Sequence, residues 1–226
     1  MDNIVKIQEI GQVTHDVKRF VIEKPDNYTF VPGQATEVSV NKPGWEDEKR
    51  PFTFTSLNED PYLEFTIKGY ADHNGVTKQI HELKENDELI IRDVWGTISY
   101  QGPGYFIAGG AGITPFIAIL RQLHKENKLA GNKLLFSNKT SADIIYKEEL
   151  SDMLGKNFIN ILTDEKPPVN SGTEYQYGRI DEAFLKQEIT DFHTQFYVCG
   201  PDKMISDINE ILGRQGAEVH RIIFEK

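Results

Sequence analysis

The chain is poor in cysteine, since Cys199 is the only one among its 226 residues. No disulfide can form within the chain, and it lacks the several thiolates that a zinc site or an iron–sulfur cluster needs. The six histidines are scattered without the spacing of metal ligands. We therefore expect no metal site, and a lone thiol fits the reducing cytoplasm.

Basic residues are also few, because 25 Lys and Arg stand against 35 Asp and Glu, for a net charge of −10. A broad basic surface for nucleic acid is therefore not expected. The N-terminus, Met1–Ile4, lacks the basic-then-apolar pattern of a signal peptide. The longest uncharged run, residues 102–120, contains glycines and prolines that would break a membrane-spanning helix. We expect a cytoplasmic monomer that contacts neither membrane nor nucleic acid.

Short runs with apolar and polar residues at near-alternate positions fill the first hundred residues. Several are bounded by turn residues, such as Pro43–Gly44, and a helix interrupts them over about residues 75–83. Short alternating strands at this spacing predict an antiparallel Greek-key β-barrel. The expected strands cover residues 4–10, 17–23, 36–40, 53–56, 63–68 and 88–91.

After Gly102 the pattern changes to apolar strands that alternate with helices. Such alternation predicts an α/β domain with a parallel sheet that is covered on both faces. We therefore expect two domains, a barrel over residues 1–101 and an α/β domain over residues 102–226. The expected strands cover residues 105–108, 133–136, 158–162 and 196–199, and the expected helices start at Thr114 or cover residues 147–154, 182–189 and 203–212.

A glycine-rich turn, Gly109–Pro115, follows the first parallel strand and opens a helix. Glycines let the backbone approach a pyrophosphate, and the helix N-terminus favours the anion. The turn is neither the six-residue dinucleotide fingerprint nor a Walker loop. A turn whose glycines serve only packing is an equally good interpretation.

A second turn, Cys199–Pro201, ends another parallel strand, so its loop should reach the same edge of the sheet. Cys199 would then lie where a nicotinamide ring can reach. The competing interpretation is a buried cysteine that acts as a small apolar residue.

The loop after the second parallel strand, Ser137–Ser141, has no acidic residue before Asp143. An acidic residue there would bind a ribose diol, whereas hydroxyls and Lys139 suit a 2′-phosphate. This pattern favours NADPH over NADH as hydride donor, with Ser137 and Lys139 as contacts. A solvated polar loop is nearly as good an interpretation.

The barrel run Arg50–Ser56 combines an arginine that can fork onto a phosphate with Phe52, which can lie flat on an aromatic ring. Thr53 points the other way and offers a hydroxyl. Alternatively, Phe52 and Phe54 simply fill the barrel.

Together these motifs resemble the ferredoxin–NADP reductase superfamily, specifically its flavodoxin/ferredoxin reductase and oxygenase-reductase branches. Arg50, Phe52 and Thr53 match that family's Arg-x-Tyr-Ser motif, with phenylalanine in place of tyrosine. The resemblance covers nearly the whole chain. The further matching motifs, in the family's order, are Pro32–Gln34, Gly75–Thr77, Gly109–Pro115 and Cys199–Pro201.

The resemblance implies FAD in the barrel and a nicotinamide dinucleotide in the second domain. It makes Arg50 a ligand of the flavin phosphate, places Phe52 on the isoalloxazine, and puts Thr53 near its hydride-accepting nitrogen. Thr53, Thr114 and Cys199 are the expected catalytic residues. The expected cofactor contacts are Arg50, Pro51, Phe52, Thr53, Ile67, Lys68, Gly75, Val76, Thr77, Gly109, Gly110, Ala111, Gly112, Thr114, Ser137, Lys139, Cys199, Gly200, Pro201 and Phe224.

Two further departures from the family pattern, besides Phe52, affect these expectations. Asp93–Gly96 stands where a Gly-Pro-x-Gly turn is common, and Ile222–Lys226 matches no terminal pattern of the family. The role of Phe224 as the second flavin-facing ring, and any proton role for Glu225, therefore stay open.

The expected function is transfer of hydride from NADPH or NADH to FAD, and of electrons to a separate acceptor: flavodoxin, ferredoxin or an oxygenase component. An acidic acceptor would need a local basic patch, formed from Lys42, Lys49, Lys68 or Lys78. Two alternatives remain: a reductase that uses free flavin as substrate, and a nucleotide-binding redox sensor without turnover.

Overall fold

The computed structural model describes residues 2–70, 75–96, 98–167, 175–218 and, for the backbone alone, 222–224. Its contacts divide the chain into two compact units. The first, here called the barrel unit, comprises residues 1–99 and 114–122, and the second, the sheet unit, comprises residues 100–113 and 123–226. Each unit is described by itself.

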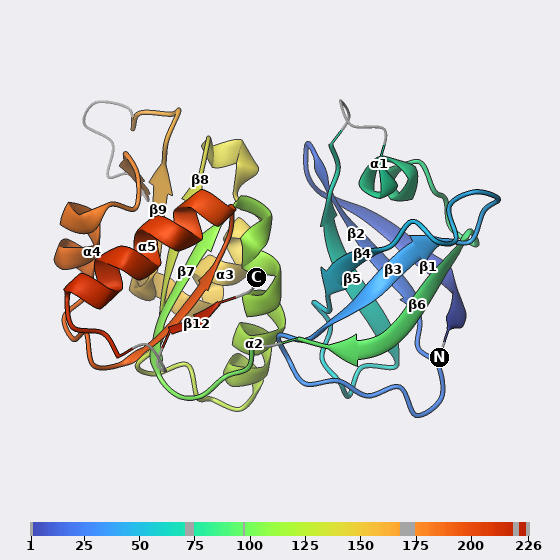
Figure 1. The fold of residues 1–226 in the computed structure, drawn as a ribbon, viewed down its shortest axis with the longest axis horizontal. Helices are drawn as coiled ribbons and strands as arrows, with labels where there is room; N and C mark the ends of the chain where they lie inside the picture. Colours follow the sequence, from blue (N-terminus) through green and yellow to red (C-terminus); the bar gives the residue numbers. More distant parts are fainter. Residues whose placement is uncertain (1, 71–74, 97, 168–174, 219–221, 225–226) are drawn as a thin grey trace. The chain divides into compact units, whose positions relative to one another are not determined.

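The barrel unit contains a six-stranded antiparallel sheet in the order β4-β3-β6-β1-β2-β5 (Figure 1). Its two ends meet, because Phe54 bridges Phe65 and the Thr55 amide donates to the Glu64 carbonyl over 2.8 Å. The sheet therefore closes into the predicted barrel. Its elements are β1 (Asn3–Thr14), β2 (Val17–Glu23), β3 (Ala35–Val40), β4 (Arg50–Thr53), β5 (Tyr62–Lys68), helix α1 (Val76–His81) and β6 (Glu88–Trp95).

Inward-facing apolar residues of all six strands fill the barrel. The rings of Phe54 and Phe65 stack at its closing edge with their centroids 5.2 Å apart. Helix α1 contributes Val76 and Ile80 to the same core, which fixes the start of this helix against the barrel.

The sheet unit is built on six parallel strands in the order β10-β9-β8-β7-β11-β12 (Figure 1). The predicted parallel sheet is thus confirmed. Its strands are β7 (Gly104–Gly109), β8 (Lys133–Asn138), β9 (Phe158–Leu162), β10 (Tyr175–Tyr177), β11 (Gln195–Cys199) and β12 (Ile222–Phe224). Its helices are α3 (Lys147–Leu154), α4 (Glu182–Glu188) and α5 (Asp202–Arg214), while α2 (Thr114–Lys125) starts in residues that group with the barrel unit.

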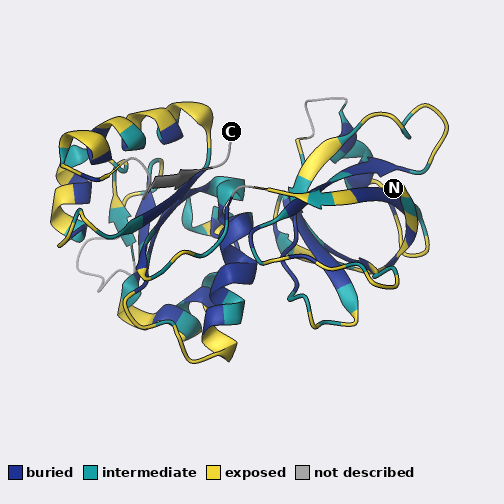
Figure 2. Ribbon diagram, turned by 60° about the horizontal axis from the view of Figure 1, so that its bottom comes forward, coloured by how far each residue is buried: buried dark blue, intermediate teal, exposed yellow. Residues whose placement is uncertain are grey.

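Helices α4 and α5 cover one face of this sheet, and α3 lies on the other (Figure 1). Phe184 and Leu185 of α4 and Ile208 and Leu212 of α5 pack with Val198 and other strand residues in one buried cluster. The two helices carry their exposed residues on the side away from the strands (Figure 2). This burial on one side is the pattern expected of helices that cover a sheet.

The structure corrects three element predictions. Strand β4 begins at Arg50 rather than Thr53, because residues 50–53 pair with β3 before the chain turns to pair with β5. Strands β10 and β12 were not expected, since each has only three residues and cannot display a periodic pattern.

Candidate functional site

A pocket in the barrel unit brings together the two segments expected to hold the flavin phosphates. Its volume is ≈ 450 Å³, and it is lined by Arg50, Tyr70, Gly75, Val76 and Thr77. Arg50 is exposed at the start of β4, and its Nη1 donates to the Lys49 carbonyl over 2.6 Å, which leaves the other guanidinium nitrogens for a ligand. Gly75 has open space beside it and provides no side-chain cap for α1.

The first amides of an α-helix lack partners within the helix, so the start of α1 offers N–H donors beside the arginine. Arginine and helix amides are the usual partners of phosphate oxygens. The pocket therefore suits the pyrophosphate of FAD. Tyr70 was missed by the sequence analysis, although its place between a strand and a predicted phosphate-binding helix was a usable signal.

The register of β3 and β4 settles how the flavin strand alternates. Arg50 pairs with Val38 and Phe52 with Thr36, so Arg50 and Phe52 share one face of the strand. Phe52 is half-buried, and its ring centroid lies 6.4 Å from that of Phe65. One part of the Phe52 ring thus packs on the barrel core, and the remainder is accessible, so its contact with a flavin ring stays a prediction.

Four further residues expected to contact the cofactor differ in how accessible their side chains are. Pro51 is exposed, and Thr53 is only 6% exposed. Ile67 lies within the barrel core, and its carbonyl is bound to His81 Nε2 over 2.8 Å, so its side chain is not available to a cofactor. Lys68 forms an ion pair with Asp16 over 2.9 Å.

In the sheet unit, the two predicted nucleotide turns lie side by side, because Ala108 of β7 pairs with Cys199 of β11. A Cβ on Gly112 would lie 2.4 Å from the carbonyl oxygen of Cys199, so only glycine lets these turns approach so closely. Gly109 is less restricted, since its Cβ would lie 2.5 Å from the sulfur of Met204, which is a flexible side chain of α5. Packing of backbone between the turns therefore explains Gly112.

Gly110 is different, because it adopts a positive φ of 52° and a Cβ there would meet open space. Ala111 beside it is half-buried, and Thr114 is half-buried at the start of α2. Gly110 is thus the position of the turn where a pyrophosphate can approach the backbone.

Cys199 is a buried residue outside any disulfide, 7% exposed at the carboxyl end of β11. Gly200 follows it with a φ of 159°, and Pro201 is exposed. Phe224 belongs to β12, where its backbone pairs with Val198. Glu225 lies outside the described residues.

Asn138 ends β8 at the same edge of the sheet, and the sequence analysis missed it. It is 6% exposed, yet neither atom of its side-chain amide has a hydrogen-bond partner within the described structure. Buried polar groups in native proteins are almost always satisfied, so this amide is an exception, and both of its polar atoms are covered by protein. Ser137, its neighbour, is half-buried opposite Gly109.

Two carboxylates hold the loop after β8, and the sequence analysis gave neither of them a role. Asp143 accepts from the Thr140 amide and hydroxyl over 2.8 and 2.7 Å. Glu165, from the loop after β9, accepts from the Ser141 amide over 2.7 Å and from its hydroxyl over 2.9 and 3.0 Å. The Tyr175 hydroxyl also donates to Glu165, over 2.7 Å.

The pKa of Glu165 is lowered from its ordinary value, first by the Ser141 amide and then by the hydroxyls of Tyr175 and Ser141. Its carboxylate is therefore ionised at neutral pH. Lys139 is exposed, and the adjacent Asp164 amide donates to the Lys139 carbonyl over 2.9 Å. The sequence carried one signal for this carboxylate: the acidic residues of Thr163–Glu165 come directly after a predicted strand.

Sequence comparison agrees with this pair of sites. Residues 4–100 match the oxidoreductase FAD-binding domain, and residues 106–210 match the oxidoreductase NAD-binding domain. The chain is an oxidoreductase of the ferredoxin–NADP reductase superfamily. The predicted family and the predicted cofactor classes, FAD and a nicotinamide dinucleotide, are thereby confirmed.

This reductase is similar to several known proteins. It is 24% identical to the reductase component of propane 2-monooxygenase from Rhodococcus jostii over 98% of this chain, and spans 62% of that protein's length. It is 29% identical to NADH-cytochrome b5 reductase 2 from Coccidioides immitis, over 91% of this chain and 67% of that protein.

The fold has a counterpart in a ferredoxin NADP⁺ reductase from Neisseria gonorrhoeae, solved with bound FAD and NADP. The TM-score is 0.85 at 20% identity, and the match covers 99% of this chain and 98% of that one. Among the described residues of the reductase, no helix is both long and apolar enough to cross a membrane.

Proposed function

We propose that this reductase takes hydride from NADH onto FAD held by residues 1–101, and that its electrons leave to a separate protein acceptor. Residues 102–226 would hold the dinucleotide. Bound FAD supplies the redox chemistry, since a flavin accepts a hydride and can release single electrons. The protein's own residues bind and orient the two cofactors.

The observation that carries this proposal is the pocket of Arg50, Tyr70 and Gly75–Thr77. Arg50 would fork onto a phosphate, the start of α1 would donate to the pyrophosphate, and the accessible part of Phe52 would lie against the flavin ring. Thr53, Thr114 and Cys199 would flank the reacting rings. Thr53 would donate a hydrogen bond that orients the flavin, and Cys199 would exclude water.

The pocket is tested by removing its cation. Arg50→Ala should weaken FAD binding about 10- to 100-fold, because hydrogen bonds to charged groups are among the stronger ones in proteins. The dissociation constant is measured by titrating apoprotein with FAD and following flavin fluorescence. Lys49→Ala is the matched control, since it removes the neighbouring cation, which does not line the pocket. Equal affinity of Arg50→Ala and the wild type would refute this assignment.

Turnover distinguishes the alternatives. Anaerobic NADH should bleach the visible absorbance of the purified yellow protein, whereas a redox sensor without turnover would stay yellow. A reductase of free flavin would lose its colour on dialysis and still reduce added riboflavin. The pocket that Arg50 forms with the start of α1 favours retained FAD.

The choice of NADH rests on Glu165. Its carboxylate already binds both donors of Ser141, which are the groups that would otherwise be offered to an anionic 2′-phosphate. A fixed negative charge there repels a phosphate, and carboxylates suit a ribose diol. This proposal replaces the preference for NADPH that the loop sequence alone suggested.

The acceptor is proposed from the relatives and from surface charge. Two similar proteins are named as an oxygenase reductase component and a cytochrome b5 reductase, which supports a separate redox protein as acceptor. Of the four lysines expected to form a basic patch, Lys42 and Lys68 are already paired, with Asp87 and Asp16. We therefore favour an oxygenase component over flavodoxin or ferredoxin, and comparing reduction rates of the three classes tests this. The single cysteine supports a cytoplasmic location, and the monomeric state stays a prediction.

A further inference from the structure

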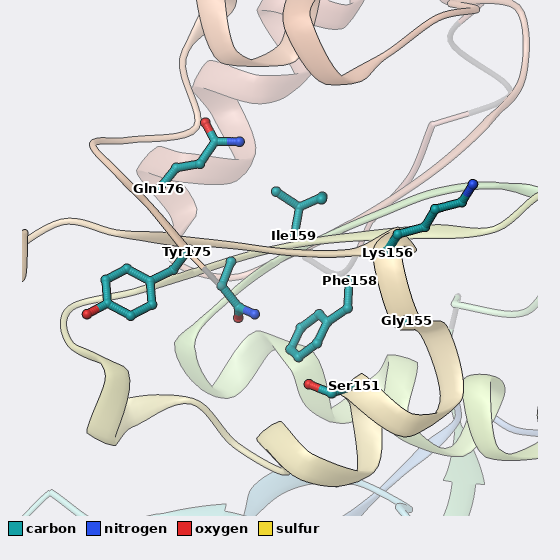
Figure 3. Close-up of a pocket in the computed structure, with 8 residues that line it drawn as sticks. Ser151, Gly155, Lys156, Phe158, Ile159, Tyr175 and Gln176 are labelled. Atoms are coloured by element: carbon teal, nitrogen blue, oxygen red, sulfur yellow. The ribbon is translucent and has the colours of Figure 1, made fainter. Parts of the chain in front are cut away.

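The sheet unit contains a pocket beside the first half of β9 that the proposed function does not use (Figure 3). Two polar side chains of its lining come from β10 and are already engaged. The Tyr175 hydroxyl donates to Glu165 over 2.7 Å. The Gln176 amide donates to Glu188 over 3.0 Å. These side chains stabilise neighbouring carboxylates, so the pocket favours no particular ligand, and a further functional role is better supported in the barrel unit.

A loop of residues 41–49, here called the β3–β4 loop, joins β3 to β4 and leads directly into Arg50 (Figure 1). Trp45 packs against the barrel core, whereas Glu48 and Arg50 are exposed. The guanidinium of Arg50 is bound to the end of this loop, since its Nη1 donates to the Lys49 carbonyl over 2.6 Å. The orientation of the proposed phosphate ligand therefore depends on the position of the loop.

Two buried polar side chains of the barrel strands hold this loop at one group, the carbonyl of Glu46. Arg92 of β6 is 7% exposed, and its Nη2 donates to this carbonyl over 3.0 Å. The hydroxyl of Ser39, which is buried in β3, donates to the same carbonyl over 2.6 Å. It also accepts from Arg92 Nη1 over 3.0 Å, so the two side chains and the loop form one hydrogen-bonded cluster.

The charge of Arg92 is poorly compensated for a buried arginine. Its ion pair with Asp2 joins Nε and Oδ1 over 3.5 Å, and the Asp2 side chain is 64% exposed, so solvent screens the attraction. The guanidinium otherwise binds neutral oxygens, those of Ser39, Ile90 and Glu46. Burying a charge on such terms adds little to stability, and an apolar side chain of similar size can replace it at low cost. The specific effect of the guanidinium is therefore to order the loop.

We propose that Arg92 is a positioning residue for FAD binding. Through the Glu46 carbonyl it orders the β3–β4 loop, and the ordered loop presents the Lys49 carbonyl that orients the Arg50 guanidinium in the phosphate pocket. This proposal rests on the proposed role of Arg50 as ligand of a flavin phosphate. A preorganised ligand group binds more tightly, because less conformational freedom is lost when the cofactor arrives.

The test measures the dissociation constant of FAD by titrating apoprotein and following flavin fluorescence. If Arg50 is correctly placed in about a third to a tenth of Arg92→Met molecules, the apparent constant rises about three- to tenfold. Ser39→Ala keeps the arginine and removes one donor to the loop, so it should raise the constant about twofold or more. The control Arg19→Met removes a half-buried arginine of the same barrel that pairs with Glu64, and it should stay within about twofold of the wild type.

A double-mutant cycle decides whether Arg92 acts through Arg50. In the Arg50→Ala background, Arg92→Met should weaken FAD binding less than about twofold, because the group that it positions is gone. Equal losses in both backgrounds would show a general effect on the barrel and would overturn the proposal. Wild-type affinity of Arg92→Met would overturn it as well. If Arg92→Met does not fold, Ser39→Ala replaces it in the same cycle.

Hydrogen exchange provides a second readout, which does not depend on FAD. Amides of residues 46–49 should exchange faster in Arg92→Met apoprotein than in the wild type, and at the wild-type rate in Arg19→Met. Unchanged exchange in Arg92→Met would refute the ordering of the loop by this residue. Failure of the proposed function would be distinct, because Arg50→Ala alone would then bind FAD as tightly as the wild type.

Discussion

Glu165→Gln should shift the reductase from NADH toward NADPH. The substitution keeps the shape of the side chain and removes its charge, and its amide competes less well for the Ser141 amide and hydroxyl. Each of these donors, once offered to a doubly charged phosphate, is worth about tenfold in binding. Because the site is open to solvent, screening lowers the total. We expect the NADPH-to-NADH ratio of kcat/KM to rise about 10- to 30-fold.

The assay is stopped-flow reduction of the bound flavin by each dinucleotide under anaerobic conditions. Glu148→Gln is the matched control, because it removes the same charge from an exposed position of α3 in the same unit. FAD content and melting temperature are measured for both variants to exclude a disturbed fold. A ratio within twofold of the wild type in Glu165→Gln would refute the proposed role of this carboxylate.

The charge of Glu165 also determines how the NADPH-to-NADH ratio of kcat/KM depends on pH. The pKa of Glu165 is lowered from its ordinary value of 4.5, chiefly by the Ser141 amide. Its charge is therefore fully present above that value and is lost only as pH falls through the lowered pKa. The preference for NADH should persist throughout the range in which the reductase is stable, and Glu165→Gln should show a constant ratio above about pH 7, where the 2′-phosphate stays doubly charged.

Three further changes test other parts of the structure. Gly112→Ala would place a Cβ 2.4 Å from the Cys199 carbonyl, so flavin reduction by NADH should slow about tenfold or more while FAD stays bound, as stopped-flow and absorbance measurements would show. Burial lowers the pKa of His81 below 6.5, so the folded state binds fewer protons, and stability should fall as pH drops from about 6.5 through the lowered pKa. His81→Gln should abolish this loss in melts between pH 5 and 7.5, and an unchanged pH profile would contradict it. Glu64→Gln removes the buried negative charge that two arginines share as an ion-pair partner. Urea denaturation should therefore show a loss of about 2 kcal/mol in the free energy of unfolding. An unchanged midpoint would count against this ion-pair network.

The alternation pattern predicted both architectures because it depends only on which faces are buried. The predicted ranges of α3 and β9 agree with the structure to the residue, and each element ends on a buried leucine, Leu154 or Leu162. Strand β4 could not be bounded in this way. Its pairing passes from one neighbour to another within five residues, which is a property of barrel closure and not of local sequence.

The candidate site was predictable where the residues are neighbours in sequence, as in Gly75–Thr77. It was not predictable where distant loops meet. Glu165 follows β9 but binds Ser141, which follows β8, and only the parallel pairing of these strands brings them together. Ile67 shows a different limit of sequence analysis. It was expected to contact the cofactor, but its side chain is buried in the barrel core.

The closing edge of the barrel has a consequence for how the barrel unfolds locally. Residues 50–53 pair with β3, and the next residues, Phe54 and Thr55, join β5, so the run that begins at Arg50 is also the seam of the cylinder. A ligand that binds Arg50 therefore stabilises this closing edge. The stability of the barrel should then rise with the fraction of protein that holds the cofactor, by mass action. Amide hydrogens of the seam should be the first of the barrel strands to exchange once the flavin is stripped away.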